Sequence, residues 1–207
     1  MSGARPILIA IPDTFSGPRV AARCYAEADA GALLALVNAA LPALSAWLPG
    51  FARPWALDDA HSHIRHSQAR WALREAFQCG LFLRETGALI GDMRLRPTDW
   101  SIPAFDIAYW LEPSAQGQGY ASEAVRLATR VAFEQLDAQR VAICCEPRNT
   151  RSRGVAERLG YLYEGCLRNQ ARAADGGLAD LLVFALTPAD YRRASASWPD
   201  AEPPARE

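Results

Sequence analysis

The sequence LEPSAQGQGYASEA, residues 111–124, joins two segments of opposite character. Residues 104–112 (AFDIAYWLE), which overlap the first two residues of this sequence, are rich in aromatic and branched side chains. Such a composition is typical of a strand. After the turn, apolar residues recur at helical spacing through residues 121–136. Gly117 and Gly119 allow the backbone to turn tightly and to approach a ligand closely. Exposed N–H groups at the start of a helix bind anions, so this strand–turn–helix unit predicts a phosphate site.

Two common phosphate-binding patterns do not fit this turn. A dinucleotide-binding fingerprint needs a third glycine where Ser122 stands, and it opens a fold instead of following four predicted strands. A Walker loop needs Gly-Lys-Ser/Thr after the turn, and this tripeptide is missing there. A turn that uses glycine only for its geometry stays open as the simplest alternative.

The remaining segments predict one mixed α/β domain. The expected order is β, α, α, β, β, β, α, β, α, β, β, with strands at residues 19–25, 79–85, 88–96, 104–112, 139–146, 161–169 and 178–187. Prolines and glycines in residues 1–18 indicate an N-terminal arm, so the domain is expected to span residues 19–192. The Pro-rich residues 193–207 are expected to form a disordered tail.

Composition argues against several classes of partner. The chain of 207 residues carries 22 Lys and Arg against 23 Asp and Glu, so charge provides no reason to expect nucleic acid. The five cysteines form no Cys-x-x-Cys pair, which favours free thiols in a reducing cytosol over disulfides or a zinc site. No apolar stretch reaches the length expected of a membrane span. We therefore expect a soluble, cytoplasmic protein that binds neither nucleic acid nor membrane.

The glycine turn also belongs to an ordered set of motifs. Read from Gln116, QGQGYA fits the pattern Gln/Arg-x-x-Gly-x-Gly/Ala. YWLEP precedes it, SEA follows it, and NTRS, AERLGY and EGCLRN come later in that order. In this set the chain resembles the GNAT N-acetyltransferase superfamily, in particular its RimJ/RimL-like branch, over roughly residues 20–190. The resemblance implies an α+β fold with a central mixed, mostly antiparallel sheet. Its fourth and fifth strands are parallel but splayed, and about four helices flank the sheet.

The resemblance also implies acetyl-CoA as co-substrate. The N–H groups of residues 118–121 would cradle its pyrophosphate, and the pantetheine arm would pair with backbone near Leu111. Asn149 would hold the pantetheine, and it suits a helix N-cap equally well. The implied cofactor-binding residues are Leu111, Gln116, Gly117, Gln118, Gly119, Tyr120, Ala121, Asn149, Ser152 and Arg153.

Acetyl transfer to an amine needs a base, a donor for the oxyanion and a proton for the leaving thiolate. Asp106 lies in the otherwise apolar fourth strand, where many relatives carry a glutamate, and is the first candidate for the base. Glu112 is the second candidate, and a backbone N–H near Leu111 would meet the oxyanion. Ala156 stands where many relatives carry a tyrosine acid, and Ser152 matches the serine that the RimJ/RimL-like branch has instead.

The resemblance predicts an N-acetyltransferase whose acceptor is a primary amine, in the first place the α-amine of a protein or peptide. A small-molecule amine such as an antibiotic or polyamine is the alternative within this class. Ala156 and Ala171, which replace a tyrosine and a glutamate of relatives, also leave open a non-catalytic acyl-CoA-binding module. No metal site is predicted, because no acidic partner completes a set with His61, His63 and His66. The identity of the acceptor and a homodimer are left open.

Overall fold

The computed structural model describes residues 5–199 and has one eight-stranded sheet with helices on both faces. Its strand order is β1-β2-β3-β4-β5-β6-β8-β7. The strands are β1 (Thr14–Ser16), β2 (Val20–Cys24), β3 (Phe77–Leu83), β4 (Leu89–Asp99), β5 (Ala104–Leu111), β6 (Arg140–Cys145), β7 (Leu162–Arg172) and β8 (Leu178–Leu186). Neighbouring strands are antiparallel except β5 and β6, which are parallel.

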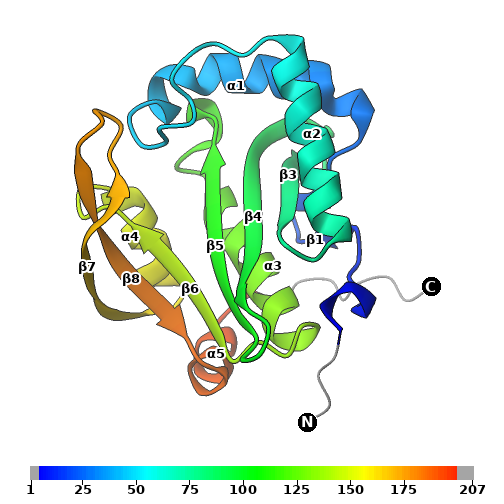
Figure 1. Cartoon of the computed structure of the whole chain (residues 1–207). Helices are drawn as coiled ribbons and strands as arrows, with labels where there is room; N and C mark the ends of the chain where they lie inside the picture. The colour runs from blue at the N-terminus through cyan, green and yellow to red at the C-terminus, as the bar shows by residue number, and fades with distance from the viewer. Residues whose placement is uncertain (1–4, 200–207) are drawn as a thin grey trace.

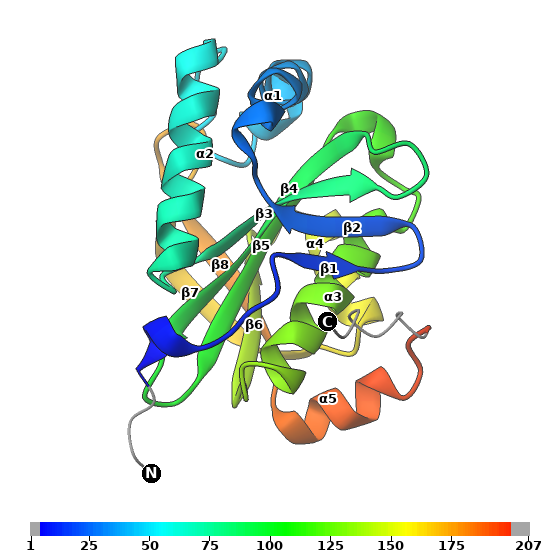
Figure 2. The same ribbon diagram turned by 90° about the vertical axis from the view of Figure 1, so that its right-hand side faces the viewer.

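Within the described residues five α-helices flank the sheet, where about four were expected. They are α1 (Ala30–Leu44), α2 (Leu57–Ala72), α3 (Tyr120–Glu134), α4 (Thr150–Arg158) and α5 (Pro188–Ser195). Helices α1 and α2 lie on one face of the sheet, and α3, α4 and α5 lie on the other (Figure 2). Short 3₁₀ turns are η1 (Pro6–Leu8), η2 (Glu27–Asp29) and η3 (Pro113–Ala115).

The parallel strands β5 and β6 stay paired over only three positions. Ala104, Phe105 and Asp106 pair with residues 140–142. Beyond these positions β5 continues to Leu111 and β6 to Cys145 without pairing with each other. Figure 1 shows the two strands diverging from this common start. The predicted splayed pair is therefore confirmed. The predicted fourth and fifth strands are β5 and β6 here, because the additional strand β1 precedes them.

Alternation along β5 separates two hydrophobic cores. Phe105, Ile107 and Leu111 are at most 6% exposed and pack in the larger core, which includes buried residues of α3. Trp110 points to the opposite face and packs against the smaller core between the sheet, α1 and α2. The helix pair α1–α2 is therefore attached to β5 through Trp110, next to the splayed part of that strand.

The ends of the chain differ from the expectation for residues 5–18 and 193–199. Thr14–Ser16, inside the expected arm, pair with β2 as strand β1. Helix α5 begins with proline in its first turn, where the missing N–H costs nothing, and it runs to Ser195. Trp198 is 8% exposed and contacts the ring of Tyr191. The remaining residues of the expected tail, 200–207, lie outside the described residues.

One segment is more apolar than the sequence analysis expected. Within the part of the chain that the structure describes, Glu27–Leu44 is long and apolar enough to cross a membrane by length and composition, with a mean hydropathy of 1.3. A core helix of a soluble protein passes the same test. Here Leu33 and Val37 are buried in the smaller core against Ile64 of α2. This packing accounts for the apolar composition of α1.

Glu123, in the first turn of α3, connects the helix to the start of β2. Its side chain is almost completely buried. The carboxylate accepts hydrogen bonds from the backbone N–H groups of Arg19 (2.7 Å) and Val20 (2.8 Å), and from Arg19 Nε (2.9 Å). Two segments that are about a hundred residues apart are thereby held together beside the glycine turn.

We expect Glu123→Ala to lower the free energy of unfolding by about 3 kcal/mol, because two backbone donors lose their acceptor and each costs about 1–3 kcal/mol. Urea unfolding measures this change. Glu157→Ala is the matched control, since it removes an exposed carboxylate paired with Arg153 and should cost less than about 0.5 kcal/mol. Similar losses for the two variants would contradict the role of Glu123.

Candidate active site

The glycine turn presents unpaired backbone donors at the start of α3. Gly117 and Gly119 have φ angles of 78° and 85°, in the left-handed region that favours glycine. Gly119 is the N-cap of α3 and provides no side-chain cap. Within residues 5–199, the N–H groups of Gln118, Gly119, Tyr120 and Ala121 donate no hydrogen bond. Free donors at the positive end of a helix dipole fit a phosphate, as the sequence predicts.

Side chains around the turn hold its shape. Gln116 Nε2 donates to the carbonyl of Leu111 (3.0 Å), and Gln118 Nε2 donates to the carbonyl of Ser114 (2.9 Å). Both glutamines thus bind the turn itself. Arg151 of α4 contacts Gln116 Oε1. This contact links the glycine turn, which follows β5, to the helix that follows β6.

Arg19 was missed by the sequence reasoning and lies beside the turn. Its Nη1 donates to the carbonyl of Gln118 (2.9 Å), and its guanidinium lies 4.9 Å from the centroid of the Tyr120 ring. Half of its side chain is exposed. This cation adds to the helix dipole at the place where a phosphate would bind. Contacts with residues about a hundred positions away, above all the ion pair with Glu123, bring it there, so no local sequence signal could have found it.

Two predicted residues of α4 face the gap between the strands. Asn149 Oδ1 accepts the N–H of Ser152 (3.1 Å) and caps α4, so the capping interpretation holds. Ser152 Oγ lies 3.2 Å from Tyr109 Oη, and Tyr109 comes from the splayed part of β5. Burial raises the pKa of Tyr109 to about 12. Ala156, where many relatives carry a tyrosine, is completely buried.

Asp106, the predicted base, lies where β5 and β6 are still paired. Arg96 of β4 donates hydrogen bonds to both carboxylate oxygens of Asp106, with Arg96 Nε 3.1 Å from each. Five positions separate Asp106 from Leu111, which is about 16 Å along a strand. Asp106 is thus paired with Arg96. To accept a proton from an amine near Leu111, Asp106 would need a chain of water molecules.

Two further predicted residues interact within their own segments. Glu112 accepts a hydrogen bond from Ser114 (2.6 Å) in the turn that follows β5. Arg153 forms an exposed ion pair with Glu157 one turn along α4 (2.7 Å). Exposed pairs of this kind are weak, so a phosphate can compete for Arg153.

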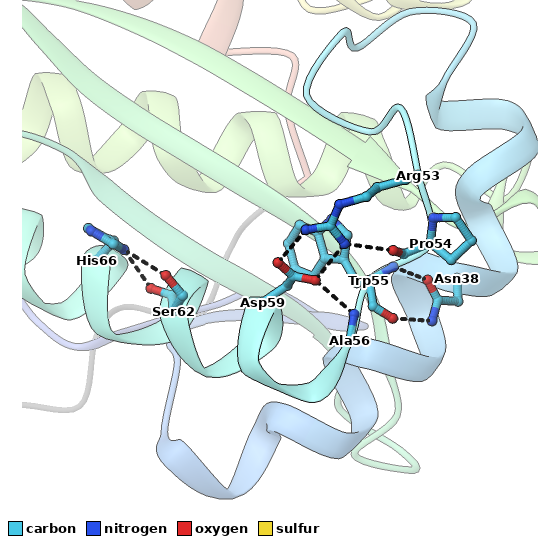
Figure 3. A network of polar contacts seen from close by, with 8 residues as sticks. All are labelled: Asn38, Arg53, Pro54, Trp55, Ala56, Asp59, Ser62 and His66. Carbon is cyan, nitrogen blue, oxygen red and sulfur yellow. Dashed lines mark hydrogen bonds and ion pairs between the residues drawn. The ribbon is translucent and has the colours of Figure 1, made fainter.

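A hollow of about 330 Å³ lies on the opposite face of the sheet, between α2, β3 and the segment that joins α1 to α2. We call it the α2 groove; its lining is Gly50, Arg53, Trp55, Asp59, Ser62, His63, His66, Ser67, Arg70 and Gln78. Figure 3 shows the polar contacts that hold residues 53–56 against α1 and α2 beside this groove. Arg53 pairs with both oxygens of Asp59 (2.8 Å each), and Asn38 exchanges two hydrogen bonds with the backbone of Trp55.

The three histidines of α2 have different surroundings. His61 Nδ1 contacts Glu27 (2.8 Å), and His66 Nδ1 contacts the carbonyl of Ser62 (2.8 Å). His63 lines the α2 groove, and its Nε2 lies 3.5 Å from Asp92 Oδ2 of β4. Asp92 is only 4% exposed and was not singled out from the sequence, where it looks like an ordinary polar residue of a strand.

Comparison with known proteins agrees with this arrangement. A family model described as the acetyltransferase (GNAT) domain matches residues 19–162. The chain is 36% identical over 100 residues to "Putative ribosomal N-acetyltransferase YdaF" of Bacillus subtilis (strain 168), covering 48% of this chain and 54% of that protein. It is 35% identical over 80 residues to "Ribosomal-protein-serine acetyltransferase" of Escherichia coli (strain K12), covering 39% of this chain and 44% of that protein. The matched region thus spans about half the length of these two relatives.

A solved structure described as a "Probable acetyltransferase" superposes with a TM-score of 0.79 at 28% identity, covering 86% of this chain and 98% of that one. Because the domain model also matches well over half of the sequence, the chain belongs to the acetyltransferase (GNAT) domain family.

Proposed function

We propose that this protein is an acetyl-CoA-dependent N-acetyltransferase of RimJ/RimL-like type that acts on the α-amine of a protein or peptide. The observation that carries the proposal is the set of free N–H groups at Gln118–Ala121, placed beside the open ends of β5 and β6. Family membership and the names of the two curated relatives support it.

The residues present fit coenzyme A. The turn and Arg19 would bind the pyrophosphate, since a Cβ added at Gly117 would meet nothing within 4 Å and one added at Gly119 would meet only Arg19 Nη2, at 3.2 Å. The backbone of β5 near Leu111, which lacks a partner strand on the β6 side, would pair with the pantetheine, assisted by Asn149. Acetyl-CoA supplies the thioester carbon that the amine attacks. A backbone N–H of β5 near Leu111 would stabilise the oxyanion.

Tyr109 and Ser152 are proposed to face the leaving sulfur. With a pKa of about 12, Tyr109 keeps its proton at neutral pH and can donate a hydrogen bond to a thiolate. Full proton transfer from Tyr109 to a thiolate, whose conjugate thiol has a pKa of about 8.5, would be uphill by more than about 4 kcal/mol. The hydroxyl pair therefore stabilises the thiolate and relays a proton from elsewhere.

The α2 groove is the proposed entrance for the acceptor. It holds Arg53, Arg70 and two histidines, while Asp59, its one carboxylate, is already paired with Arg53. A polyamine would meet like charges there, so this lining favours a peptide over the polyamine alternative. The Tyr109–Ser152 pair argues against a non-catalytic acyl-CoA-binding module, because simple binding has no need of a donor at the sulfur.

The remaining properties stay predictions from the sequence. We infer a cytoplasmic protein that binds neither nucleic acid nor membrane, on the basis of the net charge of −1 and the packing of α1. A homodimer likewise stays a prediction.

We expect isothermal titration to show saturable binding of acetyl-CoA and none of NAD. Gly119→Val should weaken acetyl-CoA binding at least about tenfold, because its side chain enters the space of the pyrophosphate and strains a left-handed φ. Gly176→Val is the matched control, with the same φ of 85° in the distant β7–β8 turn, and should keep full affinity. Equal affinity of the two folded variants would remove the turn from the cofactor site.

We expect Tyr109→Phe to lower kcat by about tenfold or more while leaving acetyl-CoA affinity within about threefold, since the hydroxyl acts when the thiolate forms. Because the pKa of Tyr109 is about 12, the hydroxyl stays protonated up to about pH 10, and its ionisation should cause no loss of turnover between about pH 8 and 10. Steady-state kinetics with an N-terminal peptide measure both effects. Unchanged kcat in Tyr109→Phe would contradict the assignment.

A further inference from the structure

His63 is the only histidine of α2 in the described chain whose ring faces a buried carboxylate. Its side chain is 27% exposed toward the α2 groove, yet its Nε2 is buried and has no hydrogen-bond partner within residues 5–199. The ring is held by aromatic contacts, with centroids 5.6 Å from Tyr25 and 5.4 Å from Trp55. A buried polar atom without a partner is costly, so its presence beside a hollow suggests a function for the ring.

Asp92 is held rigidly under His63. Tyr25 Oη donates to Asp92 Oδ2 (2.7 Å), and Gln78 Nε2 donates to Asp92 Oδ1. Both carboxylate oxygens are therefore fixed, and Oδ2 lies 3.5 Å from His63 Nε2. A small rotation of the ring would complete a hydrogen bond from Nε2–H to Oδ2. A carboxylate that accepts from one ring nitrogen leaves the other nitrogen as the base.

The pair lies close to the place proposed for the thioester. Asp92 is directly opposite Trp110 in the β4–β5 register, one residue before Leu111. Neighbouring strands are about 4.8 Å apart, whereas Asp106 lies about 16 Å down the strand from Leu111. Arg96 also occupies both oxygens of Asp106, while His63 has no such competitor. Position and pairing both favour His63 over Asp106.

Resting on the proposed function, we propose that His63 is the group that takes a proton from the acceptor ammonium, and that Asp92 is its positioning residue. Of the two protons that the ammonium loses, His63 Nδ1 takes the first, which frees the nitrogen lone pair. The N–C bond then forms, and the thioester C–S bond breaks with its electron pair on sulfur. The second proton leaves nitrogen in this step and reaches the sulfur through solvent and the Tyr109–Ser152 hydroxyl pair, giving the thiol.

The charges around His63 determine its pH dependence. The charged and titratable groups around it are Asp92, Tyr25, His66, Arg70 and the Arg53–Asp59 pair, and Arg94 lies two residues from Asp92 on the same face of β4. Burial raises the pKa of Tyr25, and Arg53 lowers the pKa of Asp59 to about 2, so neither titrates near neutral pH. His66 also lines the α2 groove and can carry a positive charge there. Its variant therefore belongs in the test.

The test uses the full chain, acetyl-CoA at saturation and a peptide with a free α-amine. His63→Gln should lower kcat/KM by about 100-fold and keep acetyl-CoA affinity within about threefold. Imidazole added to His63→Ala should restore part of the activity. His61→Gln is the matched control, since His61 contacts Glu27 outside the groove, and should retain the parent rate.

The pH profile separates a base from a merely structural histidine. The parent should lose kcat/KM as His63 becomes protonated at low pH. Asp92→Asn removes the charge that favours protonated His63. The acid limb of the kcat/KM profile should therefore move to lower pH, while the maximal kcat/KM falls. His66→Gln and Asp106→Asn should leave the position of the limb unchanged.

The outcomes distinguish the two proposals. Absence of turnover by the parent on any α-amine peptide would overturn the proposed function, and the base assignment with it. Turnover by the parent that His63→Gln leaves within about twofold would overturn only the assignment of His63. A limb that moves in Asp106→Asn and stays in Asp92→Asn would transfer the role to Asp106.

Discussion

The loss of pairing between β5 and β6 after their third position is the constraint on which the proposed site depends. Backbone groups in a sheet must find partners or solvent, and diverging strands leave an open edge on each side of the gap. At the closed end, Arg96 and Asp106 join β4 to β5 across the sheet. Toward the open end, Gln116 satisfies the carbonyl of Leu111, so part of the edge is already covered by the glycine turn.

The open end also explains why two half-sites form on opposite faces of one sheet. The glycine turn, Ser152 and Tyr109 belong to the face covered by α3 and α4, and they suit the cofactor. The α2 groove, His63 and Asp92 belong to the face covered by α1 and α2, and they suit the acceptor. In an ordinary continuous sheet the two faces would be separated by backbone. In the proposed mechanism, the splayed strands let an amine and a thioester meet between them.

Stability and function share residues around the turn. Glu123 uses its carboxylate to bind two backbone N–H groups and the guanidinium of Arg19, which leaves that guanidinium half exposed beside Gln118. The same ion pair therefore attaches β2 to α3 and places a cation at the proposed phosphate site. A buried carboxylate with three donors is well satisfied, so this placement requires no strained backbone at Arg19.

The sequence by itself determined the local features of this protein. The glycines at 117 and 119, the alternation along β5 and the cap at Asn149 each depend on neighbours within a few residues, so their patterns could be read directly. Family motifs then supplied the splayed pair, which the structure confirms. The short strand β1 and helix α5 carry weak patterns, and they form because the rest of the sheet and core offers them a surface.

Only the tertiary structure decided which polar side chains meet. Tyr109 reaches Ser152 from another element, Asp106 is paired by Arg96, and His63 lies over Asp92. Each contact joins residues from different strands or helices, and the register and crossing of those elements set it. Sequence spacing has no information about such register, which is why the different partners of the three histidines of α2 appeared only in the packed structure.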